Sequence, residues 1–522
     1  MSEKIWSPKN FKEKRAILAV GLACILLGVA VSLFPIETAV ALLAVILISG
    51  TIIAMLQYPF AIVILTIILI PFENFLVKFV PTSETLQFAL KQVSELLVYG
   101  NFMLLVIKRV LNNRFFHRTA IDLWLIFFIL AALASTIINA APIPGSFINL
   151  RAILRYTVLF YLVVNLNLTD RQKQKILKII LGIGVFQILL GVLQLGSHGA
   201  LDSFLLPPRI DFEVAGISRE GAIFTQGREI GSIFGTLGDT IFLALFLLIV
   251  LAVYLGRANK LNLRVWLSIA TILIAINYTF ARGVVLASLA MVFIFLLIRW
   301  GKDRLIIAAA FLIPFFIVGG YFLVSSAAIY RDFNNPLFEE VGIIDNLTGI
   351  FTIDYFERAQ NQRLGALLGI PPTVLFHKPL LGFGPDEETT IAELNDSEPN
   401  FLYREVVQKG FEDVYWTAIL AYFGILGLAA FAMLLLSIFL SAIKIRKQSM
   451  TAGTKQIATI VLMLITLTPF LLFFYRVLEF RSFSLYFWLL TGLMFSSYLM
   501  EKKDNFNAVS TEPCFPQCHH RD

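Results

Sequence analysis

Two adjacent carboxylates stand where an apolar segment of this chain begins, and they could do acid–base chemistry there. Glu412 and Asp413 end a long polar stretch and are followed at once by a run of apolar residues. A carboxylate in such a position can act as a general base that takes a proton from a substrate hydroxyl group. The same side chains would also cap the N-terminus of the following helix. We interpret one of the two as a candidate base and leave the choice between them open.

Arginines form the second set of candidate residues. Those that adjoin apolar segments are Arg151, Arg155, Arg228, Arg282, Arg476 and Arg481, while Arg404 lies in the polar stretch before Glu412. The planar guanidinium group holds a phosphate through two parallel hydrogen bonds and keeps its charge near apolar surface. We interpret Arg228 and Arg282 as the leading phosphate ligands, with Arg151, Arg155 or Arg404 assisting. The alternative is that these arginines anchor helix ends or form ion pairs with acids such as Glu479.

The composition requires that most of the chain lies in a membrane. Hydrophobic residues make up 58% of the 522 residues and charged residues only 15%, more apolar surface than a soluble protein of this size could bury. The apolar segments are long and lack the alternation of a transmembrane β-barrel, which predicts helices. The predicted fold class is all-α integral membrane, a polytopic bundle of about 12–14 transmembrane helices with one long outer-face loop that contains short helices.

Apolar segments and polar stretches set the predicted organisation. The predicted spans are 16–34, 37–56, 59–79, 88–107, 120–139, 150–167, 176–196, 231–255, 265–280, 283–298, 305–325, 414–443, 456–475 and 483–500. The predicted regions are N-terminal transmembrane helices in 1–325, an outer (periplasmic) loop in 326–412, C-terminal transmembrane helices in 413–500 and a disordered cytoplasmic tail in 501–522. Pro371, Pro372 and the glycines that follow predict mostly loop within the outer region.

The distribution of basic residues predicts the orientation in the membrane. Lysine-rich segments, among them Lys4–Arg15, Lys108–Arg118 and Lys444–Lys455, all fall on one side when the N-terminus is placed inside. Because positively charged loops stay in the cytoplasm, both termini are predicted to be cytoplasmic. The chain is then a multi-pass protein of the inner (plasma) membrane, and its arginine-rich segments lie at the outer face.

Two further stretches resemble a known family. Residues 377–385 read HKPLLGFGP and residues 421–431 read AYFGILGLAAF, and together they resemble the signature of the O-antigen ligase and O-antigen polymerase superfamily. Its members are polytopic membrane glycosyltransferases that use polyprenyl-diphosphate-linked glycans. The Phe-Ala-Arg-Gly sequence around Arg282 resembles a Ser-Arg-Gly element of the ligases, and the position of Arg228 is similar to that of a second diphosphate-binding arginine. One departure is that Glu412 and Asp413 stand where many members have His-Asn.

The resemblance implies a metal-independent, inverting glycosyl transfer at the outer face of the inner membrane. The implied partners are the lipid bilayer, a polyprenyl-diphosphate-linked glycan donor and a glycan or lipid acceptor; polymerase and ligase both remain open. Because the sequence contains no Walker-type phosphate-binding loop, no HExxH and no clustered metal ligands, we expect no cofactor, and we expect no nucleic acid among the partners. The alternative function is a secondary transporter of an anionic solute or glycan precursor, whose mark would be broken helices near the membrane midplane.

Overall fold

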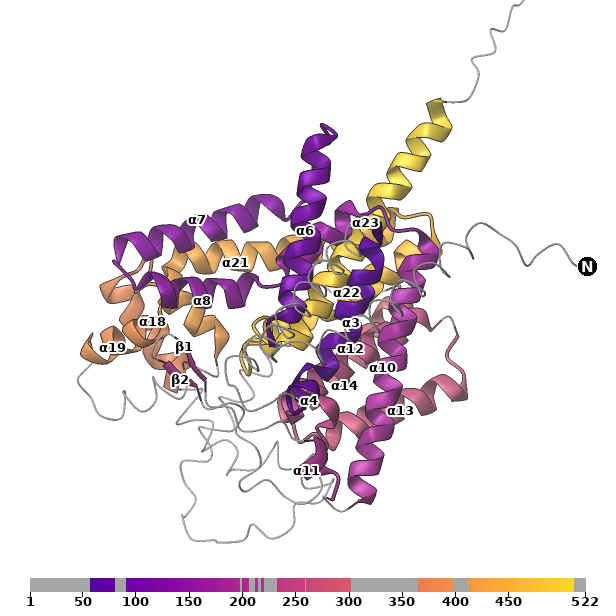
Figure 1. Ribbon diagram of the computed structural model, residues 1–522, viewed down its shortest axis with the longest axis horizontal. Helices are drawn as coiled ribbons and strands as arrows, with labels where there is room; N and C mark the ends of the chain where they lie inside the picture. Colours follow the sequence, from indigo (N-terminus) through magenta and orange to yellow (C-terminus); the bar gives the residue numbers. More distant parts are fainter. Residues whose placement is uncertain are drawn as a thin grey trace, which may run out of the picture. The chain divides into compact units, whose positions relative to one another are not determined.

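A computed structural model describes residues 57–79, 91–197, 200–205, 212–214, 217–219, 232–258, 260–301, 365–397, 411 and 414–510. The chain divides into two units, Met1–Ile62 and Val63–Asp522, and the packing below is within the second. This is an all-α polytopic membrane protein, as predicted from its composition (Figure 1). The short strands β1 (Phe212–Val214) and β2 (Ile217–Arg219) pair antiparallel.

The helices follow the apolar segments of the sequence. Their bounds are α3 Pro59–Leu69, η1 Ile70–Phe72, α4 Glu73–Val77, α6 Val93–Leu111, α7 Asp122–Ile138, α8 Ile143–Leu154, α9 Thr157–Asn165, α10 Asp170–Gly196, α11 Asp202–Leu205, η2 Gly235–Leu237, α12 Thr240–Arg257, α13 Leu263–Asn277, α14 Arg282–Arg299, α18 Gly365–His377, α19 Glu387–Ser397, α21 Tyr415–Gln448, α22 Ala452–Leu471 and α23 Arg481–Ser510.

Within the described residues, 7 helices are long and apolar enough to cross a membrane, or 8 if the bent pair α8–α9 is counted as one span. Helices α7 and α13 are apolar but shorter. Every predicted span that falls in the described ranges overlaps one of these helices. The predicted spans 16–34, 37–56 and 305–325 lie outside the described residues.

Helix α12 is at the centre of the bundle. It packs against α10, α13, α14, α22 and α23, and its residues from Leu243 to Val253 are all buried. A helix that is apolar on every side is stable only when neighbours or lipid surround it. Asp239 caps the N-terminus of this helix, and its carboxylate accepts a hydrogen bond from the backbone N–H of Ile241 at 2.6 Å.

The bundle has one end that is rich in basic residues. There Arg109 donates to the carbonyl of Asn165 at 3.1 Å, Arg299 to that of Ala258 at 3.2 Å and Arg446 to that of Ile298 at 3.2 Å. These bonds join the end of α6 to that of α9, and the ends of α12 and α21 to that of α14. The two groups meet at α23, where Lys173 of α10 contacts Met500 and the backbone of Met450 donates to Glu501. The segments that the sequence predicts to be cytoplasmic therefore share one end, here called the basic end. The loop that joins α22 to α23 lies at the opposite end.

Helix α21 is broken at Gly424, and the chain between α18 and α19 fills the break. Gly424 has φ 62° and ψ −162°, a conformation that only glycine adopts without strain. Phe383 N–H donates to Ala421 O at 2.7 Å and Gly384 N–H to Tyr422 O at 3.1 Å. In return, Ile425 N–H donates to Pro379 O at 2.8 Å. The two stretches that resemble the glycosyltransferase signature thus contact each other through their backbones.

Helix α7 secures this contact from the other side. Ser135 Oγ donates to the carbonyl oxygens of Leu381 and Tyr422, and Asn139 Nδ2 donates to Gly382 O at 3.0 Å. Figure 1 shows α7, α8 and α21 running side by side, with α18 and α19 at their ends. We call residues 379–384 and 421–426, with their shared hydrogen bonds, the backbone lock.

The structure corrects one local expectation. Pro371 and Pro372 predicted loop, but both lie inside helix α18. Proline in a helix interior removes backbone donors, so the carbonyl groups of Leu367 and Leu368, four residues earlier, lose their usual helical partners. Thr373 Oγ1 donates to Gly369 O at 3.0 Å, and His377 Nδ1 lies 3.0 Å from Thr373 O.

Substitution of Gly424 by alanine should destabilise the protein by about 2–4 kcal/mol, because the added Cβ would combine backbone strain with overpacking. That Cβ would lie 2.4 Å from the carbonyl carbon and oxygen of Leu380. Thermal unfolding of the purified protein in detergent measures the loss.

The matched control is Gly182→Ala in α10, where an added Cβ meets nothing within 4 Å. It should leave stability unchanged or raise it slightly, since alanine is the better helix former. Equal melting temperatures for the two variants would contradict the proposed role of the backbone lock.

Candidate functional site

The buried carboxylate of Glu95 gathers three arginines from distant parts of the chain. Glu95 lies in the first turn of α6 and is only 2% exposed. Its oxygens lie 3.0 Å from Arg155 Nε, 3.4 Å from Arg481 Nη2 and 3.7 Å from Arg151 Nε. A carboxylate without a partner would be very costly at this depth. One carboxylate therefore holds α6, α8 and α23 together.

Glu73 in α4 completes this group. Its Oε1 lies 2.8 Å from Arg481 Nη1, and the hydroxyl of Ser94 lies 3.4 Å from both of its oxygens. We call Glu73, Glu95, Arg151, Arg155 and Arg481 the arginine cluster. It holds three guanidinium groups and two carboxylates, so positive charge is in excess among these five residues.

Positive charge is also in excess around the arginine cluster. Lys91 precedes α6, and its backbone carbonyl accepts a hydrogen bond from the guanidinium group of Arg481. The side chains of Arg151 and Arg481 are 29% and 23% exposed, so the positive groups are accessible from outside. Such a site attracts an anion.

A second charged group surrounds Arg476 in the loop between α22 and α23. Arg476 Nη1 lies 3.2 Å from Glu387 and 3.7 Å from Glu479. Its Nη2 donates to Phe411 O at 2.9 Å, and its guanidinium lies 5.5 Å from the centre of the Phe411 ring. Burial opposes the charge of this arginine, but Glu387 and Glu479 outweigh burial and hold the pKa of Arg476 well above its usual range. Arg476 is thus a fixed cation between two acids.

The two charged groups are connected through the backbone. Arg155 Nη1 donates to the carbonyl of Glu479 at 3.4 Å, and Glu479 pairs with Arg476. Helix α8 also holds the segment that follows the backbone lock, because Asn149 Nδ2 donates to Pro385 O at 2.9 Å. The next residues begin α19, where Glu387 accepts from the hydroxyl of Tyr422 at 3.4 Å.

A polar network in the membrane fixes the segment from 232 to 239. Gln194 Oε1 accepts from the backbone N–H of Gly235 at 2.9 Å. Gln187 pairs with Thr236 through both its amide oxygen and its amide nitrogen, and Thr236 donates to Pro71 O at 2.7 Å. Backbone groups in an apolar setting need such partners. These glutamines therefore determine where the chain that follows Arg228 enters the bundle.

Arg282 begins α14 at the same end of the bundle as the loop between α22 and α23. A Cβ on the neighbouring Gly283 would lie 3.1 Å from the ring of Tyr475. The preceding turn is also tied to the segment at 232–239, since Ile233 N–H donates to Tyr278 O at 3.0 Å. Arg282 is thus positioned by a turn that contacts both neighbouring segments.

The cluster lies within the apolar thickness of the bundle. Residues 95 to 111 of α6 span roughly 24 Å, and the nine residues of α9 roughly 14 Å. Both helices end at the basic end, so the cluster lies inside an apolar layer of about 30 Å. Ionisable residues at such a depth lower the stability of a membrane protein, and they usually have a function.

The structure describes three of the seven predicted site residues. Arg151 and Arg155 lie together in the arginine cluster, and Arg282 begins α14. The ion pairs that were the alternative interpretation are present, since Arg476 pairs with Glu479. Four candidates, Arg228, Arg404, Glu412 and Asp413, lie outside the described residues.

Four residues of the site were not among the sequence candidates. They are Glu73, Glu95, Glu387 and Tyr422. For Glu73 and Glu95 a signal was available, because each is a carboxylate inside an otherwise apolar segment. Glu387 follows the first signature-like stretch and Tyr422 lies within the second, but only the fold brings them together.

No family model matches the chain, and no curated protein matches it. In the part of the chain that the structure describes, no group of three or more His, Cys, Asp or Glu side chains could hold a metal ion. The chemistry that the described site offers is electrostatic. It combines an accessible excess of guanidinium groups with a neighbouring pair of carboxylates.

Removing the shared carboxylate with Glu95→Gln should destabilise the protein by about 3–5 kcal/mol, because buried guanidinium groups lose their partner. Unfolding by SDS in mixed micelles measures the change. The control is Glu393→Gln, whose pair with Lys378 is 40% and 34% exposed and should be worth about 1 kcal/mol or less.

A second variant separates lost pairing from general disruption. In the double variant Glu95→Gln/Arg155→Gln, part of the lost stability should return, because one uncompensated charge is removed. Strictly additive losses would show that Glu95 and Arg155 do not act as a pair.

Proposed function

We propose that this chain is a membrane glycosyltransferase, of the polysaccharide polymerase or O-antigen ligase type, that joins polyprenyl-diphosphate-linked glycans at the outer face of the inner membrane. One observation carries the proposal. Arginines from α8 and α23 converge on buried carboxylates, with positive charge in excess, toward the end of the bundle opposite the basic end. Guanidinium groups in such a setting suit a lipid-linked diphosphate.

The donor would enter from the bilayer and bind through its diphosphate. Arg151 and Arg481 are the cluster arginines that are most accessible to it. Arg228 and Arg282 would supply further guanidinium groups, as the resemblance implies, and Arg155 and Arg404 would assist. Because the leaving diphosphate gains negative charge as its bond to the sugar breaks, fixed cations stabilise the transition state more than the ground state.

The acceptor would be activated by Glu412 or Asp413. The carboxylate takes the proton of an acceptor hydroxyl, whose oxygen forms a bond to the anomeric carbon of the donor sugar. The bond between that carbon and the diphosphate oxygen breaks, and the electron pair leaves on the lipid diphosphate with inversion at the sugar. Glu412 is the next residue after Phe411, and the carbonyl of Phe411 accepts from Arg476. Arg476 is therefore a positioning residue in this proposal.

A secondary transporter of an anionic solute or glycan precursor is the second candidate. Two observations favour it: α21 is broken at Gly424, and α8 and α9 meet at a bend of 46°. Transporters use interrupted helices of this kind to bind substrates within the membrane. Uptake of a labelled anionic solute by proteoliposomes, without any glycan product, would favour the transporter over the enzyme.

The proposed orientation places the basic end in the cytoplasm and the arginine cluster toward the outer face. In a variant without native cysteines, Phe376→Cys should react with a membrane-impermeant maleimide added outside intact cells. Phe115→Cys should react only after permeabilisation. Phe376 and Phe115 are 85% and 94% exposed, so labelling reports their side of the membrane. The reverse pattern would invert the topology and remove the outer-face reaction.

Transfer of sugar from a lipid-linked oligosaccharide to an acceptor, measured with the purified protein, tests the enzyme. Arg228→Ala, Arg282→Ala and Arg481→Gln should each lower kcat by about 10²–10³-fold, because each removes a cation from the leaving group. The control is Arg299→Gln at the basic end, which should keep the wild-type rate. If Arg228→Ala and Arg282→Ala both retain the full rate, the mechanism is wrong.

A further inference from the structure

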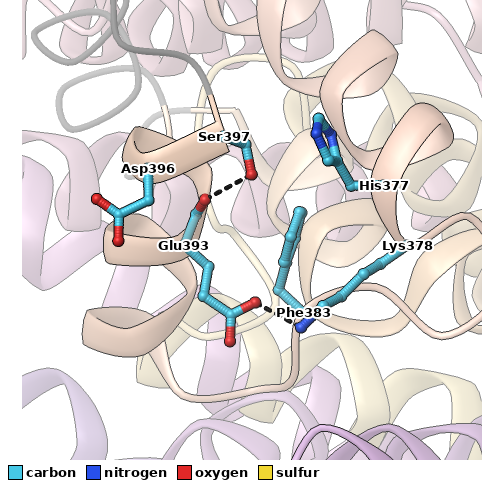
Figure 2. A pocket seen from close by; sticks show the side chains of 6 residues that line it. All are labelled: His377, Lys378, Phe383, Glu393, Asp396 and Ser397. Carbon is cyan, nitrogen blue, oxygen red and sulfur yellow. Dashed lines mark hydrogen bonds and ion pairs between the residues drawn. The ribbon is translucent and has the colours of Figure 1, made fainter.

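A polar groove lies between the end of α18 and the side of α19. It has a volume of about 540 Å³ and is lined by His377, Lys378, Phe383, Glu393, Asp396 and Ser397. Figure 2 shows Glu393 reaching from α19 toward Lys378, with the ring of Phe383 between α19 and His377, while the carboxylate of Asp396, farther along α19, points away from Lys378. This volume is within the range of small-molecule binding sites.

The groups that line the groove match a polyhydroxylated ligand. Carboxylates, the Ser397 hydroxyl oxygen and the second ring nitrogen of neutral His377 accept hydrogen bonds from hydroxyl groups, while the ammonium of Lys378 donates to ring and hydroxyl oxygens. Lys378 pairs with Glu393 and lies 5.1 Å from the centre of the Phe383 ring, so donor and acceptor are held side by side. Phe383 is buried and supplies an apolar floor.

The charge of the groove is opposite to that of the arginine cluster. Glu393 and Asp396 together outweigh Lys378, which leaves a net negative charge when His377 is neutral. An anionic group such as a phosphate or a uronate is repelled there, whereas a neutral sugar or an amino sugar is accepted. The two sites are therefore suited to different parts of one substrate assembly.

The backbone lock makes the groove rigid. Phe383 and its neighbours are bound to the broken helix α21 through their backbone N–H and C=O groups. The hydroxyl of Thr390 donates to Gly384 O at 2.6 Å and ties α19 to the same segment. A site that is already ordered before binding loses little conformational entropy when it binds.

The groove and the charged groups also share one short piece of chain. Phe383 forms the floor of the groove, and Glu387 pairs with Arg476. Glu387 is four positions after Phe383, so their Cα atoms lie within about 14 Å of each other. A saccharide of a few units can bridge that separation.

We propose that this groove binds a neutral or amino-sugar saccharide of the glycan substrate, at a subsite separate from the anion-binding arginines. The inference rests on the proposed glycosyl transfer for its role, although binding of the saccharide is measurable without it. Glu393 and Asp396 accept hydrogen bonds from sugar hydroxyl or amino groups, and Lys378 donates. Ser397 Oγ and the second ring nitrogen of His377 also accept, because the Ser397 hydroxyl donates to Glu393 O and His377 Nδ1 lies 3.0 Å from Thr373 O.

Equilibrium binding to the full-length protein in nanodiscs tests the groove directly, with three trisaccharides as probes. They are chitosan trisaccharide, N,N′,N″-triacetylchitotriose and trigalacturonate. The first two should bind at least about tenfold more tightly than the third, because the groove repels a carboxylate. If wild-type protein binds neither of the first two, or binds trigalacturonate equally well, the inference is wrong.

The double variant Glu393→Gln/Asp396→Asn should raise the Kd of the first two probes by about tenfold and abolish the discrimination against trigalacturonate. Glu388→Gln is the matched control, since Glu388 is an exposed carboxylate of α19 that does not line the groove. It should bind all three probes as the wild type does. An unchanged melting temperature shows that the double variant is folded, and unchanged binding by it overturns the inference.

Kinetics separate this inference from the proposed function. In the transfer assay the double variant should have a higher KM than the wild type for one of the two glycan substrates, with the same kcat. Measuring KM for the donor and then for the acceptor identifies which of the two glycans binds in the groove. If the wild type binds the saccharides with this charge dependence but transfers no sugar, the groove stands and the transferase proposal fails. If transfer proceeds and the double variant changes neither KM, the transferase stands and the groove's role fails.

Discussion

The backbone lock between residues 379–384 and the broken helix α21 is the constraint on which both sites depend. A helix that breaks inside an apolar layer exposes carbonyl and amide groups that must find partners. Here the partners come from a loop, whose own N–H and C=O groups are satisfied by the same bonds. The glycines at 382 and 424 permit this approach, because a Cβ at either position would meet backbone atoms at 2.3 or 2.4 Å. The lock therefore fixes the floor of the groove and the start of α19 together.

The charges around the lock follow a second physical rule. A buried ion is tolerated when opposite charges surround it, and the pairing does not have to be one to one. Glu95 forms ion pairs with three guanidinium groups, whereas Arg476 forms ion pairs with two carboxylates. Neighbouring sites of opposite excess charge result, joined by the bond from Arg155 to the carbonyl of Glu479. Such an arrangement is suited to holding an anionic group beside a polar, uncharged one.

The helices were predictable from the sequence because hydrophobic runs of membrane length admit no other regular structure. The break at Gly424 was not, because a glycine inside an apolar run is common and its φ is set by a distant loop. Short helices were expected in the outer region, but not that helix α18 would continue through Pro371 and Pro372, because two prolines usually end a helix. The convergence of Arg151, Arg155 and Arg481 on Glu95 also depends on the packing of α6, α8 and α23, which sequence spacing does not encode. The arginines and the carboxylates inside apolar segments were visible in the sequence; their partners were not.

The position of Arg481 at the first residue of α23 has a consequence for biosynthesis. The guanidinium group that bridges the carboxylates of Glu73 and Glu95 is synthesised 408 residues after Glu73. Until then Glu73 lacks the arginine that neutralises it in the finished protein. The membrane-inserted nascent chain must therefore keep this acid hydrated or protonated, and completion of the arginine cluster coincides with insertion of α23.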